Sequence, residues 1–344
     1  MLPRIFSFLL LIPSFAGAAD VLVVLNKSDD TASLLDAKTG LTRATVPVGH
    51  GPHEAEILAD GRTVAVSDYG DRERPGRSVT LIDVERGVKV ATIGLPEGSR
   101  PHGLEALRDG RLLVTAEGIK ELLVVDPKNR RVRTRIPTGQ EVAHMVVASP
   151  AGDRAYVANI GSGSVTVVDL AAGKVVREVP TGEGAEGIDV TPDGREVWVT
   201  NRSADTVSVL DAGTLGVVAT IPAAKFPIRV KVTPDGKRAL VSCAESGEVA
   251  IFDVASRKEI RRIRIGGEAV AGDQPRVFGT RFGRRPVPVG LLIAPDSRRA
   301  WVASTNADVV TALDLDSYAA IRRLTAGREP DGLAGVFETK STSP

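Results

Sequence analysis

Residues 155–195 read AYVANIGSGSVTVVDLAAGKVVREVPTGEGAEGIDVTPDGR, and residues 196–237 repeat the plan as EVWVTNRSADTVSVLDAGTLGVVATIPAAKFPIRVKVTPDGK. Each copy holds four short runs rich in β-branched residues, separated by turn-forming Gly, Pro, Asp and Asn. The runs alternate apolar and polar residues, as in TVSVL at 206–210, which is the period of a half-buried strand. Each copy is therefore predicted to form a unit of four β-strands.

An aspartate ends the second run of every copy along the whole chain, and the intervals between successive aspartates are 47, 43, 43, 42, 42 and 61 residues. These seven residues are Asp36, Asp83, Asp126, Asp169, Asp211, Asp253 and Asp314. A period in the low forties with four strands per unit is typical of β-propellers. We predict an all-β, seven-bladed propeller of four-stranded antiparallel blades, in which the aspartates cap turns.

The repeat resembles a known family. The segments Tyr156-Val157-Ala158-Asn159 and Trp198-Val199-Thr200-Asn201, each preceded by a Gly- or Asp-containing turn, are similar to the YVTN family of β-propeller repeats, and the resemblance covers nearly the whole mature chain. The wider relatives that it implies are propellers like the haem-d1 domain of cytochrome cd1 nitrite reductase, the methylamine dehydrogenase heavy chain, lactonases and a streptogramin lyase. The resemblance implies the fold and leaves the chemistry open.

The order of the strands predicts how the ring closes. If the strands are lettered A to D from the axis outward, the mature chain begins at Val21 with a B strand and ends with an A-like run at 332–337. We expect this last strand to join the first three in one blade, which removes an open sheet edge. The predicted domain is a single propeller over residues 19–338, followed by a disordered tail at 339–344. The D-to-A and B-to-C loops then share one face, called here the top face.

The N-terminus resembles a secretory signal. Arg4 precedes a short apolar run at 5–12, and the small residues at 16–18 suit cleavage just after Ala18. We predict a signal peptide at 1–18 and a periplasmic or secreted protein; an uncleaved anchor is the alternative. The apolar run is too short to span a bilayer, so no integral membrane span is expected in the mature chain.

Composition limits the partners of the protein. The chain has 44 Lys and Arg against 43 Asp and Glu, and only 4% aromatic residues. This balance provides no overall field to attract nucleic acid, and few rings are available to stack on bases. Cys243 is the only cysteine and lies in an apolar run, so we interpret it as a buried side chain rather than a nucleophile. We expect a monomer that binds a small molecule or a protein, and no nucleic acid.

Three of the four histidines share one register of the repeat. Aligning the A strands from their Asp-Gly turns produces a column that reads His53, His102, His144, Glu186, Ile228, Val289 and Asp331. Because the ring is closed, Asp331 neighbours His53, and the polar members form one arc at the top of the channel. Ile228 and Val289 are expected to fill the opposite side.

Several interpretations of this arc are open. His53, His102 and His144 are candidate ligands of a divalent transition metal, because imidazole with carboxylate suits Zn, Fe, Mn or Cu. They could instead provide an axial ligand to a haem-like macrocycle or a general base. In a purely structural interpretation, each histidine caps the start of a strand. His50, three residues before His53, is expected to be a solvated loop histidine that is also within reach of the mouth.

Two departures from the repeat fall on the same face. An insertion at 266–287 lies in a D-to-A loop, and its basic and aromatic residues suit either a lid over an anionic ligand or a solvated excursion. Of its arginines, Arg281, Arg284 and Arg285 are predicted at the channel mouth, together with Arg229 on an A strand. A smaller extension at 70–77 has mixed charges and is expected to be a solvated loop.

Motif searches identify no complete catalytic set. The sequence lacks G-x-S-x-G, P-loop, H-E-x-x-H and C-x-x-C patterns. We therefore favour an exported binding protein whose ligand sits at the top of the channel. A metal-assisted lyase or hydrolase resembling the streptogramin-lyase and lactonase propellers is the first alternative, and a tetrapyrrole-binding protein resembling the d1 domain is the second.

Overall fold

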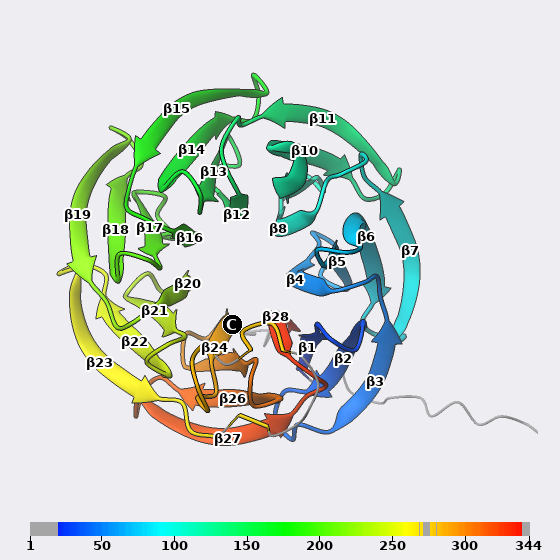
Figure 1. Cartoon of the computed structure of the whole chain (residues 1–344), viewed down its shortest axis with the longest axis vertical. Coiled ribbons are helices and arrows are strands. Elements are labelled where there is room, and N and C mark those ends of the chain that lie inside the picture. The colour runs from blue at the N-terminus through cyan, green and yellow to red at the C-terminus, as the bar shows by residue number, and fades with distance from the viewer. Residues whose placement is uncertain (1–19, 268, 271–275, 280, 339–344) are drawn as a thin grey trace, which may run out of the picture.

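Seven four-stranded antiparallel sheets form a closed ring around one axis (Figure 1). The computed structural model describes residues 20–267, 269–270, 276–279 and 281–338. This architecture confirms the predicted seven-bladed propeller. The predicted signal peptide at 1–18 and the predicted tail at 339–344 lie outside the described residues.

The blades are numbered from the one that contains the chain start. The innermost, or A, strands of blades 1 to 7 are β28 (Pro330–Val336), β4 (Pro52–Ile57), β8 (Pro101–Ala106), β12 (Ala143–Ala148), β16 (Ala185–Val190), β20 (Pro227–Val232) and β24 (Pro288–Ile293). The B strands are β1 (Val21–Asn26), β5 (Thr63–Gly70), β9 (Leu112–Ala116), β13 (Arg154–Asn159), β17 (Glu196–Asn201), β21 (Arg238–Cys243) and β25 (Arg299–Ser304).

The outer two layers complete each blade. The C strands are β2 (Thr31–Asp36), β6 (Pro75–Asp83), β10 (Glu121–Asp126), β14 (Ser164–Asp169), β18 (Thr206–Asp211), β22 (Glu248–Asp253) and β26 (Val309–Asp314). The D strands are β3 (Thr42–Pro47), β7 (Val88–Gly94), β11 (Arg131–Pro137), β15 (Lys174–Pro180), β19 (Gly216–Pro222), β23 (Lys258–Arg264) and β27 (Ala319–Thr325). A short 3-10 helix, η1 (Glu117–Ile119), follows β9.

The ring closes as predicted, by pairing of the last strand with the first. β28 runs antiparallel to β1, with Val21 opposite Val336 and Val23 opposite Ala334. Both strands are almost wholly buried, so the pairing covers apolar side chains as well as backbone groups. The clasp leaves no exposed inner edge in blade 1.

The core lies between neighbouring blades. The buried face of one blade packs on the buried face of the next, as where Tyr156 and Val167 of blade 4 cluster with Val197 and Val199 of blade 5. Burying each such side chain contributes roughly 1.5–3 kcal/mol. Cys243 is fully buried in the next cluster, as predicted, and burial raises its pKa to about 12.

The repeated aspartates cap turns, as predicted. The carboxylate of each one accepts a hydrogen bond from the backbone N–H three residues ahead, at 2.7–3.0 Å. The C-to-D turn of every blade is thereby fixed by one side chain, which explains why the repeat keeps this residue.

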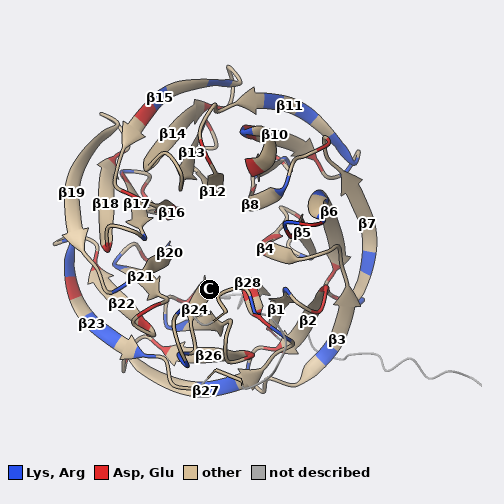
Figure 2. Cartoon of the chain, in the orientation of Figure 1, with Lys and Arg blue, Asp and Glu red and all other residues tan. Residues whose placement is uncertain are grey.

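Charge is distributed unevenly over the ring. Figure 2 shows Lys and Arg along outer strands such as β11, β23 and β27, whose side chains are mostly exposed. Acidic residues occur on the inner strands β4 and β28. Among the described residues, no helix is long and apolar enough to cross a membrane.

The extension in blade 2 is solvated, as predicted, since residues 71–75 and 77 are exposed, but it is a hairpin rather than a loop. The strands β5 and β6 continue into it, and Gly70 pairs with Pro75, so only a four-residue turn remains. The pairing is possible because Gly70 adopts a positive φ of 76°, where any Cβ would lie 2.1 Å from the Arg74 carbonyl oxygen. The charged residues of the extension therefore lie on a β-hairpin.

Candidate functional site

The start of each A strand carries a β-bulge on the top face. In blade 2, Pro52 pairs with Asp68 and Ala55 with Val66, so His53 and Glu54 share the bulge. The A strands of the other six blades show a register shift at the same place. A bulge re-aims side chains, and here it lets two consecutive residues contribute to the channel mouth.

The structure brings the five polar members of the predicted column together, in the predicted order. Asp331 Oδ2 lies 3.2 Å from His53 Nδ1, and the ring centroids of His53 and His102 are 3.9 Å apart. The His102 and His144 centroids are 3.5 Å apart, and His144 Nε2 lies 3.4 Å from Glu186 Oε1. The arc is therefore a continuous chain of contacts.

A second layer of side chains, which we did not predict, surrounds the arc from the B-to-C loops. Glu117, at the start of η1, bonds to His144 Nδ1. The Tyr69 hydroxyl donates to the other Glu117 oxygen at 2.7 Å. This Tyr69–Glu117–His144 chain joins blades 2, 3 and 4, and it fixes the orientation of the His144 ring.

The two ends of the arc are also held by ion pairs. Lys27 Nζ lies 3.3 Å from Asp331 Oδ2, and Arg202 Nη1 lies 2.9 Å from Glu186 Oε2. Both cations come from the position just after a B strand. The carboxylates at the two ends are thus neutralised within the protein.

Arg229 bridges the channel from the far side. Its guanidinium bonds to Glu54 and lies 3.4 Å from Glu186 Oε1. The Arg229 side chain is only 5% exposed, so the pairs form away from bulk water. Ile228, which precedes it, clusters with Val289 as expected of the apolar side.

Burial and charge set the protonation of the histidines. Burial, followed by the neighbouring His144 and His53, lowers the pKa of His102 well below its ordinary value, so this imidazole is neutral. Burial also lowers the pKa of His53, although Asp331 acts in the opposite direction. For His144 burial again lowers the pKa, but Glu117 and Glu186 outweigh it and the net shift is upward. His144 and Glu117 therefore form an ion pair.

The carboxylates of the site stay ionised. Burial raises the pKa of Glu54, but Arg229 outweighs burial and brings it down to about 2. In Glu186, His144 and Arg202 likewise outweigh burial and lower the pKa to about 2. The site thus offers anionic oxygens beside neutral imidazole.

His102 is the residue whose surroundings are least complete. It is fully buried, and neither ring nitrogen has a hydrogen-bond partner among the described residues. Its nitrogens lie within two groups of potential ligand atoms, and in each group all the atoms are within 4.8 Å of one another. One group contains His53, Glu54 and His102, and the other contains His102, Glu117 and His144.

A small cavity lies in the channel below the arc. It has a volume of about 170 Å³, and its charged lining consists of Glu54, Glu56, Arg229 and Lys231. Beneath the arc, Glu56 and Glu105 have pKa values raised to about 7 and 8, chiefly by burial.

Two carboxyl groups below the arc, those of Glu105 and Asp189, each accept a hydrogen bond from the backbone. Glu105 accepts from the Ala148 N–H at 3.2 Å, and Asp189 accepts from the Val232 N–H at 2.7 Å. Each bond joins the A strand of one blade to that of the next. These residues hold the inner ring together below the histidines.

The insertion covers the apolar side of the mouth. Phe282 is buried with Phe226, Ile228 and Val289, and the Arg281 guanidinium lies 4.6 Å from the centre of the Phe226 ring. The predicted arginines of the insertion are therefore placed on the side opposite the histidines.

The other arginines of the insertion lie at its base. Arg285 bonds to the Glu245 carbonyl oxygen, and the Arg284 carbonyl accepts from the Ala269 N–H at 3.1 Å. Arg276 forms a paired contact with Asp308 at 2.8 Å. Residues 268, 271–275 and 280 of the insertion lie outside the described residues.

His50 is not simply solvated, as we had expected. Its Nδ1 lies 2.9 Å from Asp30 and its Nε2 lies 2.7 Å from Asp71. Burial lowers the pKa of His50, but the two carboxylates outweigh it, so the net shift is upward. The imidazolium joins the loops of blades 1 and 2, outside the arc.

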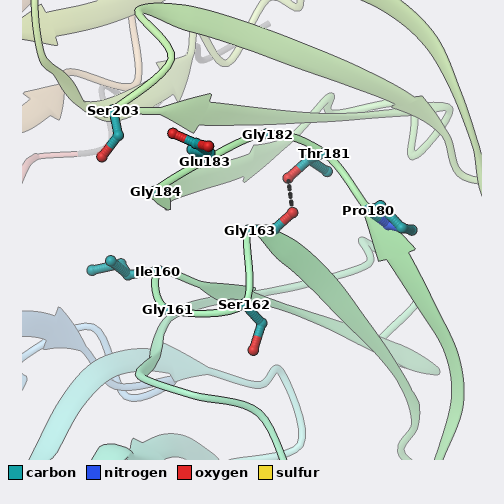
Figure 3. A pocket seen from close by; sticks show the side chains of 10 residues that line it. All are labelled: Ile160, Gly161, Ser162, Gly163, Pro180, Thr181, Gly182, Glu183, Gly184 and Ser203. Carbon is teal, nitrogen blue, oxygen red and sulfur yellow. Dashed lines mark hydrogen bonds between the residues drawn. The ribbon is translucent and has the colours of Figure 1, made fainter.

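A separate open pocket of about 520 Å³ lies on the top face between blades 4 and 5 (Figure 3). It is lined by residues 160–163, 180–184 and Ser203, and Glu183 is its only charged lining residue. The Thr181 hydroxyl donates to the Gly163 carbonyl oxygen at 3.3 Å across it. The pocket lacks the charged groups that converge at the arc.

The repeat can now be compared with known families. Residues 102–272, which span blades 3 to 6, match the model of the YNCE-like beta-propeller family. Four consecutive blades are thus similar to this family. The YNCE-like blades include His102, His144, Glu186 and Arg229, whereas His53 lies outside the matched residues. The predicted resemblance to YVTN-type propeller repeats is confirmed. No curated protein matches the sequence.

Solved structures share the fold of these YNCE-like blades. A functionally unknown protein from Desulfotomaculum acetoxidans DSM 771 is 14% identical, with a TM-score of 0.76, over 93% of this chain and 99% of that chain. Hydrazine synthase of Kuenenia stuttgartiensis is 20% identical, with a TM-score of 0.69, over 82% and 88%. The dihydro-heme d1 dehydrogenase NirN, in complex with DHE, is 19% identical, with a TM-score of 0.60, over 91% and 74%. At these identities the likeness shows the fold alone.

A second sequence column could have identified the outer layer of the site. The residues just after the end of the regular B-strand run, read blade by blade, are Lys27, Tyr69, Glu117, Ile160, Arg202, Ala244 and Thr305. The polar members gather beside the histidine arc, as they do in the A-strand column. Glu54 gave no such signal, because Gly, Met and Arg occupy its position elsewhere and only the bulge turns it to the mouth.

Proposed function

We propose that this propeller is a binding protein that holds a divalent transition metal at the top of its channel, through His53, His102 and His144 with neighbouring carboxylates. The metal in turn presents open coordination positions to a small ligand. The observation that carries the proposal is His102, a fully buried imidazole whose two nitrogens lack hydrogen-bond partners among the described residues. Buried polar groups are almost always satisfied by protein, water or a bound ion, so an imidazole with both nitrogens unpaired within the protein supports a bound group here.

The chemistry of the donors supports a metal. A metal-bound imidazole must be neutral, and the lowered pKa of His102 and His53 keeps both rings in that form. Imidazole with carboxylate suits Zn, Cu or Fe more than Ca or Mg, which prefer all-oxygen sites. Asp331 contacts the ligand His53, as outer carboxylates do in metal sites.

The first experiment is to measure bound metal in the mature protein purified from its native compartment, alongside His102→Ala. We expect stoichiometric transition metal in the natural protein and a loss of at least 100-fold in affinity in the variant, with the fold intact by circular dichroism. Zinc titration of the metal-free protein provides the affinity for the natural chain and each variant.

His50→Ala is the matched control, since His50 is also a top-face histidine with two carboxylate contacts but lies outside the arc. It should bind metal like the natural protein. Absence of metal from the purified protein, together with no zinc binding by the metal-free protein, would overturn the proposal.

A metal-assisted hydrolase or lyase is the second candidate. It is favoured by the bond between Glu117 and His144, since a carboxylate beside an arc histidine is what a general base would need. Assays of the metal-loaded protein on lactones and related esters test this candidate, with metal-free protein and His102→Ala as blanks. Turnover that is independent of the metal would exclude it.

A tetrapyrrole ligand has less support. NirN was solved in complex with DHE, which motivates the comparison. The channel cavity below the arc here is about 170 Å³, smaller than the roughly 300–1,000 Å³ of pockets for drug-sized ligands. Haem titration followed by absorbance is the direct test, and a saturable Soret shift lost in His102→Ala would make the tetrapyrrole the preferred ligand.

We also propose export to the periplasm or beyond, directed by residues 1–18. The support is the sequence pattern of a charged start, an apolar run and small residues before Ala19. N-terminal sequencing of the protein from the extracytoplasmic fraction should begin at Ala19. A cytoplasmic chain that begins at Met1 would contradict it.

A further inference from the structure

The two groups of potential ligand atoms at the arc share one residue. His53 and Glu54 come from blade 2, whereas Glu117 comes from blade 3 and His144 from blade 4. His102 of blade 3 belongs to both groups. The five residues form two groups rather than one, so their ligand atoms do not all lie within 4.8 Å of one another. One ion with bonds of ~2.1 Å spans at most about 4.2 Å between two donors, so it cannot use all five residues.

From this sharing we infer that the channel mouth binds two metal ions, bridged by the imidazole of His102. The inference rests on the proposed metal site and specifies it. One ion would be held by His53, Glu54 and His102, and the other by His102, Glu117 and His144. Each ion would then take one ring nitrogen of the bridging residue.

The burial of His102 is the main argument. A single ion would use one nitrogen and leave the other as an unpaired polar atom in a fully buried side chain. Two ions use both nitrogens. The surroundings also match on the two sides, because each half contains one further histidine and one glutamate.

Each half also has an outer partner that orients its ligand. Asp331 lies 3.2 Å from His53 Nδ1, and Tyr69 donates to Glu117 at 2.7 Å. The structural interpretation, in which the histidines only cap strand starts, does not explain why both halves carry this support. It also leaves both His102 nitrogens unused.

Binding of both ions requires the His102 ring to lose its proton. A neutral imidazole has one N–H and one lone pair, so the first ion binds the lone pair. The second ion binds the other nitrogen only when the N–H proton leaves for solvent, and His102 then becomes an imidazolate. The ionised ring of His144 must also lose its proton to become a ligand.

Copper(II) is the probe for the test, because two copper ions bridged by imidazolate are magnetically coupled. The metal-free full-length mature protein is titrated with copper sulfate, passed through a desalting column, and analysed for copper content and for EPR intensity at low temperature. We expect two copper ions per chain and an EPR intensity well below that copper content. Glu117→Gln should bind one ion per chain with full EPR intensity.

Glu183→Gln is the control, since Glu183 is an exposed glutamate on the same face that belongs to neither group. It should behave like the natural protein. The wild-type measurement decides the inference even if Glu117→Gln fails to fold. One copper per chain with full intensity, or two that are not coupled, would overturn the bridge and leave the proposed metal site intact. No bound copper would overturn both.

Discussion

At the scale of single residues, Arg229 is the buried cation that pairs with two carboxylates of the channel. It is buried against Glu54 and Glu186, and both carboxylates depend on it for part of their lowered pKa. Arg202 contacts the same Glu186 but has a 30% exposed side chain. The two arginines therefore allow a buried ion pair to be compared with a half-exposed one.

We expect Arg229→Met to lower the free energy of unfolding by about 3–5 kcal/mol, because it leaves the buried carboxylate of Glu54 without its cation and removes one of the cations that contact Glu186. Arg202→Met should cost less than about 1.5 kcal/mol, since solvent screens the pair. Urea unfolding of the two variants measures both. Equal losses of unfolding free energy in the two variants would show that burial does not determine how much these ion pairs contribute to stability.

Glu105 predicts a pH dependence of stability. Burial, and then the nearby Glu56, raise its pKa to about 8, so the folded protein keeps it protonated where the unfolded chain is ionised. Unfolding then releases a proton between about pH 4.5 and 8, and stability falls as the pH rises through that window. Below pH 4.5 Glu105 is protonated in both the folded and the unfolded state, so its titration no longer lowers the free energy of unfolding.

Glu105→Gln keeps an acceptor for the Ala148 N–H and removes the titration. Between pH 5 and 8 the natural protein should lose about 3–4 kcal/mol more stability than the variant. Thermal unfolding across this range provides the difference curve. Parallel curves for the two proteins would contradict the raised pKa.

At the scale of elements, the A strands approach each other through glycines at the bulge. A Cβ on Gly103 of β8 would lie 2.6 Å from the His144 carbonyl oxygen of β12. Gly187, Gly290 and Gly332 meet the next A strand in the same way, at 2.0–2.4 Å. Because these glycines have no Cβ, adjacent A strands can approach closely enough for the column residues of neighbouring blades to touch.

We therefore expect Gly103→Ala to cost about 1–3 kcal/mol, because backbone rather than a flexible side chain must move. Gly94→Ala, at the end of β7, is the control, since a Cβ there meets nothing within 4 Å. Differential scanning calorimetry of the two variants provides the comparison. A Gly103→Ala protein as stable as Gly94→Ala would mean that the blades tolerate a wider spacing.

At the scale of the whole molecule, stability depends on the clasp between β28 and β1. Deleting the residues after Glu329 removes an A strand, exposes the edge of β1 and uncovers Leu22 and Val24, which cluster with Leu333. We expect a loss of at least about 5 kcal/mol, comparable to the stability of an entire domain. Thermal melting of the truncated chain measures it; melting at the full-length temperature would show that the ring does not need closure.

The sequence by itself determined the number of blades, the strand order, the clasp and the histidine column. These follow from a repeat of about 42 residues and from the two-residue period of a strand, both of which are local properties of the chain. The same logic, applied one column outward, would have placed Lys27, Tyr69 and Glu117 near the arc.

Only the tertiary structure decided which of these side chains touch. Glu54 reaches Arg229, 175 positions further along the chain, because a bulge turns it inward and closure of the ring brings blades 2 and 6 to the same axis. His102 likewise lies between His53 and His144 of the neighbouring blades, and within the described part of the chain its ring nitrogens have no hydrogen-bond partner. Contacts across a closed ring depend on the geometry of all seven blades, which no local pattern records.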